Sequence, residues 1–248
     1  YLIKQGADFI KVTATGGSTR TSFPLRPSFS QHELNVIAEE AHKFGKHVAA
    51  HCHSSEAMKR ALNAGVDTII HGVFKDVDGT NNYREDVADL MLEKGAFVNP
   101  TLGPGLMRAI ILENKKENGD FNEQDQEDLD LVYRENEHRL ECFNKLISLG
   151  VPMSAGSDSA WGGYKMGNYF LDIEGHVKGG QSPIEAIMSA TDIAAQSCWI
   201  DDNLGSIETG KLADILVVEE DPSKQIENLR TVVDVIKDGQ LIDRQSLL

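Results

Sequence analysis

Two histidines stand one residue apart in the segment KHVAAHCHSS, and a third ends the segment TIIHG. They are His51, His53 and His71. Neutral imidazole is a good ligand for zinc and related divalent metals. His51 and His71 each end an apolar run of the kind that forms a buried strand. If these strands end at one edge of a sheet, their histidines can share a metal.

Three further polar residues lie at or just past the ends of other apolar runs. They are Lys11 in DFIKVT, Thr101 after AFVNP, and Asp158 in VPMSAGSD. One histidine at a strand end is more often a structural residue, but several histidines together with Asp158 favour a metal site. An amine in a buried strand is costly unless it is paired or modified. Lys11 therefore either reaches a carboxylate with its head group or carries a carbamate formed with CO₂.

The roles of the neighbouring histidines are open at this stage. His51 and His53 alternate with Cys52 and so lie on one face of their strand. They can chelate one metal as a pair, or His53 can line a pocket beside a metal that His51 holds.

Apolar runs alternate with helical patterns along most of the chain. Strands are predicted within residues 8–13, 47–51, 66–72, 96–101 and 151–158, and helices within 30–45, 54–64, 84–95 and 123–149. Ser30 and Glu33 have the spacing of a capping box. This alternation predicts an α/β fold with a parallel sheet. A (β/α) barrel places its chemistry at the carboxyl ends of its strands, whereas an open doubly wound sheet lacks support because no GxGxxG turn follows a strand.

Residues 200–248 differ in character, because they are β-rich and carry turn signals at Gly205, Gly210, Asp221–Pro222 and Asp238–Gly239. We expect a small β segment there.

Composition excludes some partners. The formal net charge is −15, which repels nucleic acid and anionic membranes, and no apolar run is long enough to cross a bilayer. The cysteines are three and show no CxxC spacing, which slightly favours a reducing, cytoplasmic setting. Any export signal would precede Tyr1, so the sequence leaves export open.

Several segments together resemble the amidohydrolase superfamily, in particular its prolidase-like and imidazolonepropionase-like metallohydrolases. They are GADFIKVTATGG, VAAHCHS, TIIHG, SAGSD and the tail from ATDIAAQ to VEEDP. The resemblance covers nearly the whole chain. It implies a (β/α)8 TIM barrel of the metal-dependent hydrolase type. Residues 1–199 would supply strands four to eight of that barrel, and residues 200–248 the C-terminal part of a small β-sandwich domain.

The resemblance also implies a role for each candidate residue in a binuclear site, commonly of zinc. Lys11 would be the carboxylated lysine that bridges the metals, and His51 and His71 would be ligands. Asp158 would bind one metal and shuttle a proton, while His53 would face the substrate. The HCH segment could instead match the HxH pair that the family carries on its first strand. Chain order argues against this, because the family's lysine follows that pair whereas Lys11 precedes HCH.

The function implied is hydrolysis of C–N (amide or peptide) bonds in small substrates such as dipeptides or N-acyl amino acids. A hydroxide on the metals would attack the carbonyl, and Asp158 would carry the proton. Arg20 and Arg26 could hold a substrate carboxylate, with Thr101 as a further substrate contact. Among metal-dependent hydrolases, the alternative is cyclic amidase, imidazolonepropionase-like or lactonase activity. The alternative outside the enzymes is a non-catalytic fragment or subunit of such a barrel. Because the HxH pair of the family's first strand is then not among these residues, we expect a homo-oligomer or association with a missing N-terminal segment.

Overall fold

The computed structural model describes residues 1–17, 23–160 and 163–244 of the 248. The chain divides into two compact units, one of residues 1–101 and 122–154 and the other of residues 102–121 and 155–248. Among the described residues, no helix has both the length and the apolar character to cross a membrane.

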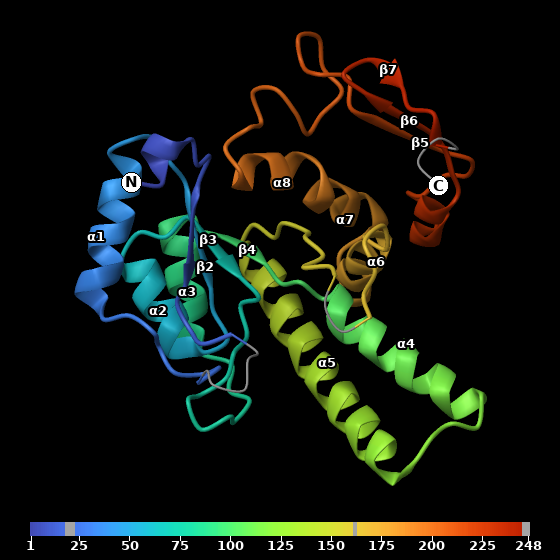
Figure 1. The fold of residues 1–248 in the computed structure, drawn as a ribbon, viewed down its shortest axis with the longest axis horizontal. Coiled ribbons are helices and arrows are strands. Elements are labelled where there is room, and N and C mark those ends of the chain that lie inside the picture. Colours follow the sequence, from blue (N-terminus) through green and yellow to red (C-terminus); the bar gives the residue numbers. More distant parts are fainter. Residues whose placement is uncertain (18–22, 161–162, 245–248) are drawn as a thin grey trace. The chain divides into compact units, whose positions relative to one another are not determined.

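A four-stranded parallel sheet forms the centre of the first unit (Figure 1). Its strands, in spatial as in chain order, are β1 (Ile10–Thr13), β2 (Val48–His51), β3 (Thr68–Ile70) and β4 (Phe97–Asn99). The segment predicted as a fifth strand continues the sheet by one parallel bridge, in which Val98 exchanges backbone hydrogen bonds with Pro152 and Ser154. The predicted α/β fold with a parallel sheet is therefore confirmed, and a closed barrel of eight strands stays a prediction.

The two faces of this sheet differ in burial. Alternate residues of the strands form one fully buried face, made by Val12, Ala50, Ile69 and Val98. The helices α1 (Gln31–His42), α2 (Ser55–Asn63) and α3 (Glu85–Lys94) lie on one side of the sheet (Figure 1). On the other face Ala49 and Thr68 are buried, whereas Lys11 and Thr13 are exposed and His51 is half-buried. The chemically active residues thus lie on the open face of the sheet.

Local signals in the sequence explain where several helices begin and end. The Ser30 hydroxyl accepts from the Glu33 N–H, and the Glu33 carboxylate accepts from the Ser30 N–H, which confirms the predicted capping box of α1. The long helix α5 (Glu123–Leu149) begins after the capping residue Asn122 and ends at Gly150, whose φ of 93° is in the left-handed region.

The second unit contains helices that the sequence patterns did not predict and a sheet that they did. Its helices are α4 (Gly103–Glu117), α6 (Phe170–Lys178), α7 (Pro183–Ala190) and α8 (Asp192–Ser197). Two short 3₁₀ helices complete the fold, η1 (Ile3–Gln5) in the first unit and η2 (Ile226–Arg230) in the second.

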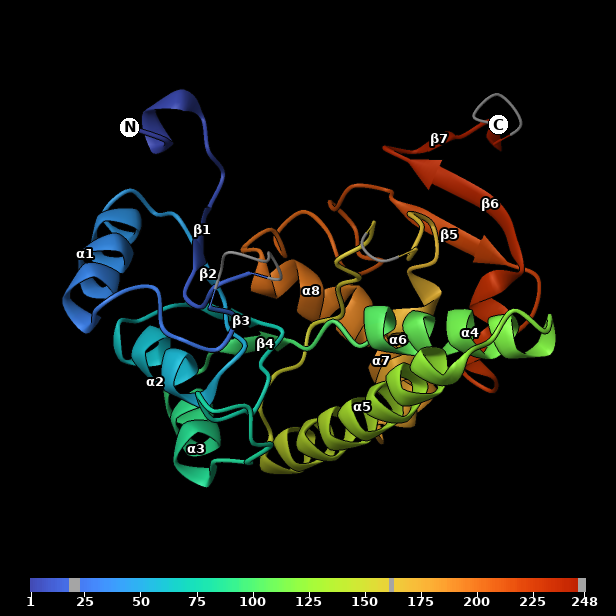
Figure 2. The same ribbon diagram turned by 60° about the horizontal axis from the view of Figure 1, so that its bottom comes forward.

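The β-rich character after residue 200 is confirmed. The strands β5 (Ile215–Val218), β6 (Val232–Lys237) and β7 (Gln240–Leu241) form an antiparallel sheet (Figure 2). Asp238 and Gly239 make the two-residue turn between β6 and β7, both with positive φ. Because the second unit holds this sheet together with α6 to α8, a domain boundary at residue 200 stays a prediction.

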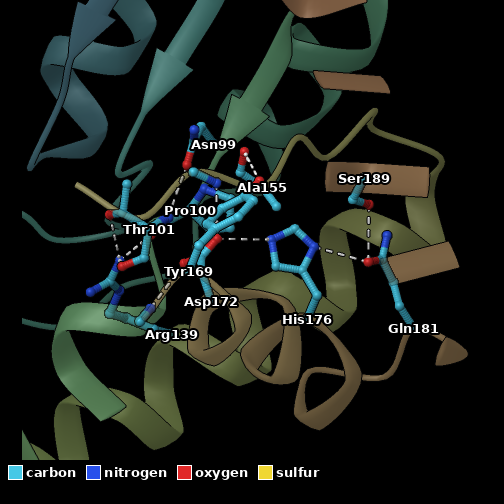
Figure 3. A network of polar contacts seen from close by, with 12 residues as sticks. Asn99, Pro100, Thr101, Arg139, Ala155, Tyr169, Asp172, His176, Gln181 and Ser189 are labelled. Carbon is cyan, nitrogen blue, oxygen red and sulfur yellow. Dashed lines mark hydrogen bonds and ion pairs between the residues drawn. The ribbon is translucent and has the colours of Figure 1, made fainter. Parts of the chain in front are cut away.

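A buried polar network holds the second unit together (Figure 3). The fully buried Asp172 carboxylate accepts from the N–H groups of Gly103 and Gly156, each at 2.9 Å. The ring of His176, also fully buried, lies 2.9 Å through Nδ1 from Oε1 of Gln181, which also accepts from the Ser189 hydroxyl at 3.1 Å. Burial lowers the pKa of His176, so its imidazole is neutral in the folded chain near pH 7.

This burial of His176 makes stability fall in mild acid. An unfolded imidazole titrates near ~6.5, so below that pH the unfolded chain binds a proton that folded His176 rejects. Between pH 6.5 and pH 5, the free energy of unfolding of His176→Gln should fall by less than that of the wild type. The difference between the two losses should be at most about 2 kcal/mol. Urea unfolding at both pH values measures this difference, with the exposed His32→Gln variant as control. Equal losses in the wild type and in His176→Gln would contradict the prediction.

Candidate metal centre

Three histidines converge at the carboxyl edge of the parallel sheet. His51 ends β2, His53 follows it by two residues, and His71 comes directly after β3. One ligand nitrogen from each lies within 4.8 Å of the other two. Because β2 and β3 are paired in parallel with His51 opposite Ile70, their ends meet at the same edge. The convergence that the sequence predicted for His51 and His71 is present in the first unit.

The contacts within this cluster are close. Nε2 of His71 lies 2.9 Å from Nδ1 of His51, and the ring centres of the three histidines are 4.3 to 4.6 Å apart. His53 is as near to the other two rings as they are to each other. The sequence-based expectation set His53 apart as a substrate residue, whereas its position also allows it to be a metal ligand.

The electrostatic setting favours the neutral form of His53 and His71. Burial, with the neighbouring His51 ring and the Arg139 and Lys75 charges, lowers the pKa of His53 to about 3. Burial, with the neighbouring His53 and His51 rings, also lowers the pKa of His71 far below its ordinary value. Neutral imidazole is the form that binds metal. The three convergent imidazoles are therefore a donor set that fits a zinc-like divalent ion.

Thr101 belongs to this cluster through His71. Its hydroxyl oxygen lies 2.8 Å from Nδ1 of His71, on the side of the ring away from the Nε2 contact with His51. The residue is almost fully buried, with 3% of its surface exposed. The Thr101 hydroxyl thus faces a histidine, where the sequence predicted contact with substrate.

Lys11 is exposed, which corrects the expectation that it lies in a buried strand. The reason is that β1 is an edge strand of the described sheet and that Lys11 lies on the open face, opposite Ala49 of β2. The Lys11 charge is still close enough to the cluster to contribute to the lowered pKa of His71. The bridging carbamate stays a prediction.

Asp158 belongs to the second unit. It is exposed, has a φ of 46°, and follows Gly156, whose N–H is held by the buried Asp172. Its expected roles as ligand and proton shuttle stay predictions.

Of the two arginines proposed for substrate binding, the structure describes one. Arg20 lies outside the described residues. Arg26 is exposed, and its guanidinium lies 5.0 Å from the centre of the Phe23 ring. A role of either arginine in holding a substrate carboxylate stays a prediction.

Two residues that hold turns of the chain through hydrogen bonds were not predicted from the sequence. They are Arg139 and Asp172. Arg139 lies on the polar helix α5, where nothing in the local pattern distinguishes it from other surface charges. Asp172 does leave a signal, because it is an acid within the largely apolar segment YFLDIEGHV, where an unpaired charge would be costly.

Known proteins resemble this chain in sequence and in fold. The sequence profile described as Amidohydrolase family matches residues 2–242. Ochratoxinase from Aspergillus niger is 31% identical over 244 residues, which cover 96% of this chain and 47% of that protein.

Solved structures show the same likeness. A Xaa-Pro dipeptidase, crystallised with methionine in its active site, superposes with a TM-score of 0.77 at 36% identity over 97% of this chain and 55% of its own. The crystal structure of Aspergillus niger ochratoxinase superposes with a TM-score of 0.74 at 30% identity, covering 96% of this chain and 51% of its own. The chain spans about half the length of the curated relatives it matches. From the profile match over nearly its full length, the chain belongs to the amidohydrolase family, a family of hydrolases that is generally metal-dependent.

Proposed function

We propose that the protein containing this chain is a metal-dependent hydrolase of C–N bonds in small substrates such as dipeptides or N-acyl amino acids. One observation carries the proposal, which is the convergence of three histidines at the carboxyl edge of a parallel sheet in an amidohydrolase-family chain. The likeness to a Xaa-Pro dipeptidase supports a substrate of dipeptide size. Cyclic amides and lactones are the alternative substrates.

In this proposal His51 and His71 hold the metal, because their ring nitrogens face each other at 2.9 Å and both rings are at least half-buried. Lys11, as a carbamate, and Asp158 would complete a zinc site. Bound zinc would polarise a carbonyl group and lower the pKa of a water molecule toward ~7.

The remaining residues would act on the substrate and on protons. His53, at the half-buried side of the cluster, would donate a hydrogen bond to the substrate and orient its carbonyl. Asp158 would take the proton from the attacking water and return it to the leaving amine. A guanidinium of Arg20 or Arg26 would hold a substrate carboxylate through its two parallel N–H groups.

The open edge of the sheet points to an additional protein segment. Within the described residues β1 has one hydrogen-bonded neighbour, β2, although the exposed edge of a sheet is a template for further strand pairing. We propose that β1 pairs either with a further segment of the same protein or with a second copy. Sedimentation equilibrium of the intact protein distinguishes the two, and a stable monomer in which the β1 amides exchange freely with solvent would contradict both.

The histidine assignment predicts different losses for three single substitutions. We expect His51→Ala and His71→Ala each to lower zinc affinity by more than about 100-fold. Loss of a residue that only hydrogen-bonds to a metal ligand costs roughly 10–100-fold, and loss of the ligand itself should cost more. His53→Ala should keep its zinc but lose turnover of a dipeptide panel. Zinc content by mass spectrometry and hydrolysis rates measure this in the intact protein, with the exposed His32→Ala variant as control.

Two results would contradict this account. If His53→Ala lost its zinc while His51→Ala kept it, the two roles would be reversed. If all three variants kept wild-type zinc content, the cluster would not be the metal site, and hydrolysis by this route would be excluded.

Lys11 gives a separate prediction, because two metals need an anionic bridge and no Asp or Glu lies at the end of its strand. Lys11→Ala should lose zinc, and a short carboxylate such as acetate or propionate should restore part of it. The exposed Lys4→Ala variant is the matched control. Unchanged zinc content in Lys11→Ala would rule out a bridging carbamate.

A further inference from the structure

A single arginine from the long helix α5 holds the turn that follows β4. The guanidinium of Arg139 donates to the carbonyl oxygen of Thr101 at 3.0 Å and to that of Pro100 (Figure 3). It also donates to the Thr101 hydroxyl oxygen at 3.3 Å. All three hydrogen bonds come from one nitrogen, Nη2, so a single atom of Arg139 joins the helix to a turn that precedes it by 38 residues.

The turn that Arg139 holds is strained. Thr101 has a φ of 46°, which is a genuine outlier for a β-branched residue. A backbone in this region is costly and persists only where its surroundings enforce it. The enforcing contacts here are Arg139 on two carbonyls and the Asn99 side chain, whose oxygen accepts from the Thr101 N–H at 3.2 Å.

What the strain achieves is the placement of one hydroxyl. Oγ1 of Thr101 lies 2.8 Å from Nδ1 of His71. His71 itself has a φ of 70°, and its N–H donates to the carbonyl of Asn99 at 2.8 Å. Two neighbouring strands therefore both leave the β region at their ends, and they meet at the hydrogen bond between Thr101 and His71.

This hydrogen bond decides which nitrogen of His71 is available. A guanidinium has only donors, so Arg139 takes one lone pair of the Thr101 oxygen, and the second lone pair can accept a hydrogen bond from Nδ1–H of His71. If the Thr101 hydroxyl instead donated to Nδ1, the proton of His71 would lie on Nε2, a result in the wild type that would overturn the inference. With its proton on Nδ1, His71 presents the lone pair of Nε2 to the cluster, where Nδ1 of His51 lies at 2.9 Å. A partner on one ring nitrogen sets the tautomer and the orientation of a metal-binding imidazole.

We propose that Arg139 is a positioning residue that acts through Thr101 to hold His71 as its Nδ1–H tautomer, with Nε2 directed at the shared metal position. The inference deepens the proposed function and rests on it for the identity of the metal. The placement of the His71 proton is a property of the metal-free chain, so it can be measured without turnover.

The test uses four variants of the intact protein. Arg139→Met removes all three donations, and Arg139→Lys keeps the charge on a side chain that ends one bond short of Nη2. Thr101→Val removes the hydroxyl at nearly constant volume. Arg134→Met, an exposed arginine on the same helix, is the matched control. Long-range ¹H–¹⁵N correlation spectra of the metal-free proteins report which nitrogen of His71 carries the proton, and zinc titration reports affinity.

We expect the wild type and Arg134→Met to show the Nδ1–H tautomer. Arg139→Met, Arg139→Lys and Thr101→Val should show a mixture or the Nε2–H tautomer, with zinc affinity lowered about 10–100-fold. Should Arg139→Met fail to fold, as shown by its circular dichroism spectrum, Arg139→Lys and Thr101→Val decide the question.

An unchanged tautomer and unchanged zinc affinity in the folded variants would overturn the role of Arg139 while leaving the proposed hydrolase intact. A tautomer change in a protein that never binds zinc would support the positioning role and overturn the proposed metal-dependent hydrolase.

Discussion

Three imidazoles within 4.8 Å of one another, all at least half-buried, cannot all be charged, and the rest of the site depends on that constraint. Burial lowers the pKa of His53 and of His71, and the neighbouring rings lower it further. The neutral rings then offer lone pairs to whatever ion lies between them. The arrangement depends on register, because a slip of one residue between β2 and β3 would turn His51 toward the helices and away from His71.

The support for His71 comes from outside its own strand. Its side chain contacts Thr101, its backbone N–H contacts Asn99, and Arg139 holds the turn that contains Thr101. The backbone strain at His71 and Thr101 would relax if these contacts were absent, since nothing local favours a left-handed threonine. A distant helix and a strained turn thus determine how one ring presents its nitrogen.

The parts of the fold that the sequence could predict are those with local causes. The capping box at Ser30 and the left-handed Gly150 mark helix ends by chemistry within a few residues, so α1 and α5 were predictable. The exposure of Lys11 was not, because it depends on what covers one face of the sheet. The contact between Arg139 and Thr101 was not either, since it joins residues 38 positions apart and helix α5 is polar along most of its length. His71 and His51 could be paired in advance only because parallel strands end at one edge.

The most direct test of the central claim is the position of a bound metal. Diffraction from crystals of the intact protein grown with zinc, recorded on both sides of the zinc absorption edge, gives an anomalous difference map. We expect a peak between Nε2 of His71 and a ring nitrogen of His51, at about 2.0–2.1 Å from each. A protein that binds zinc elsewhere, with no anomalous peak beside these two rings, would contradict it.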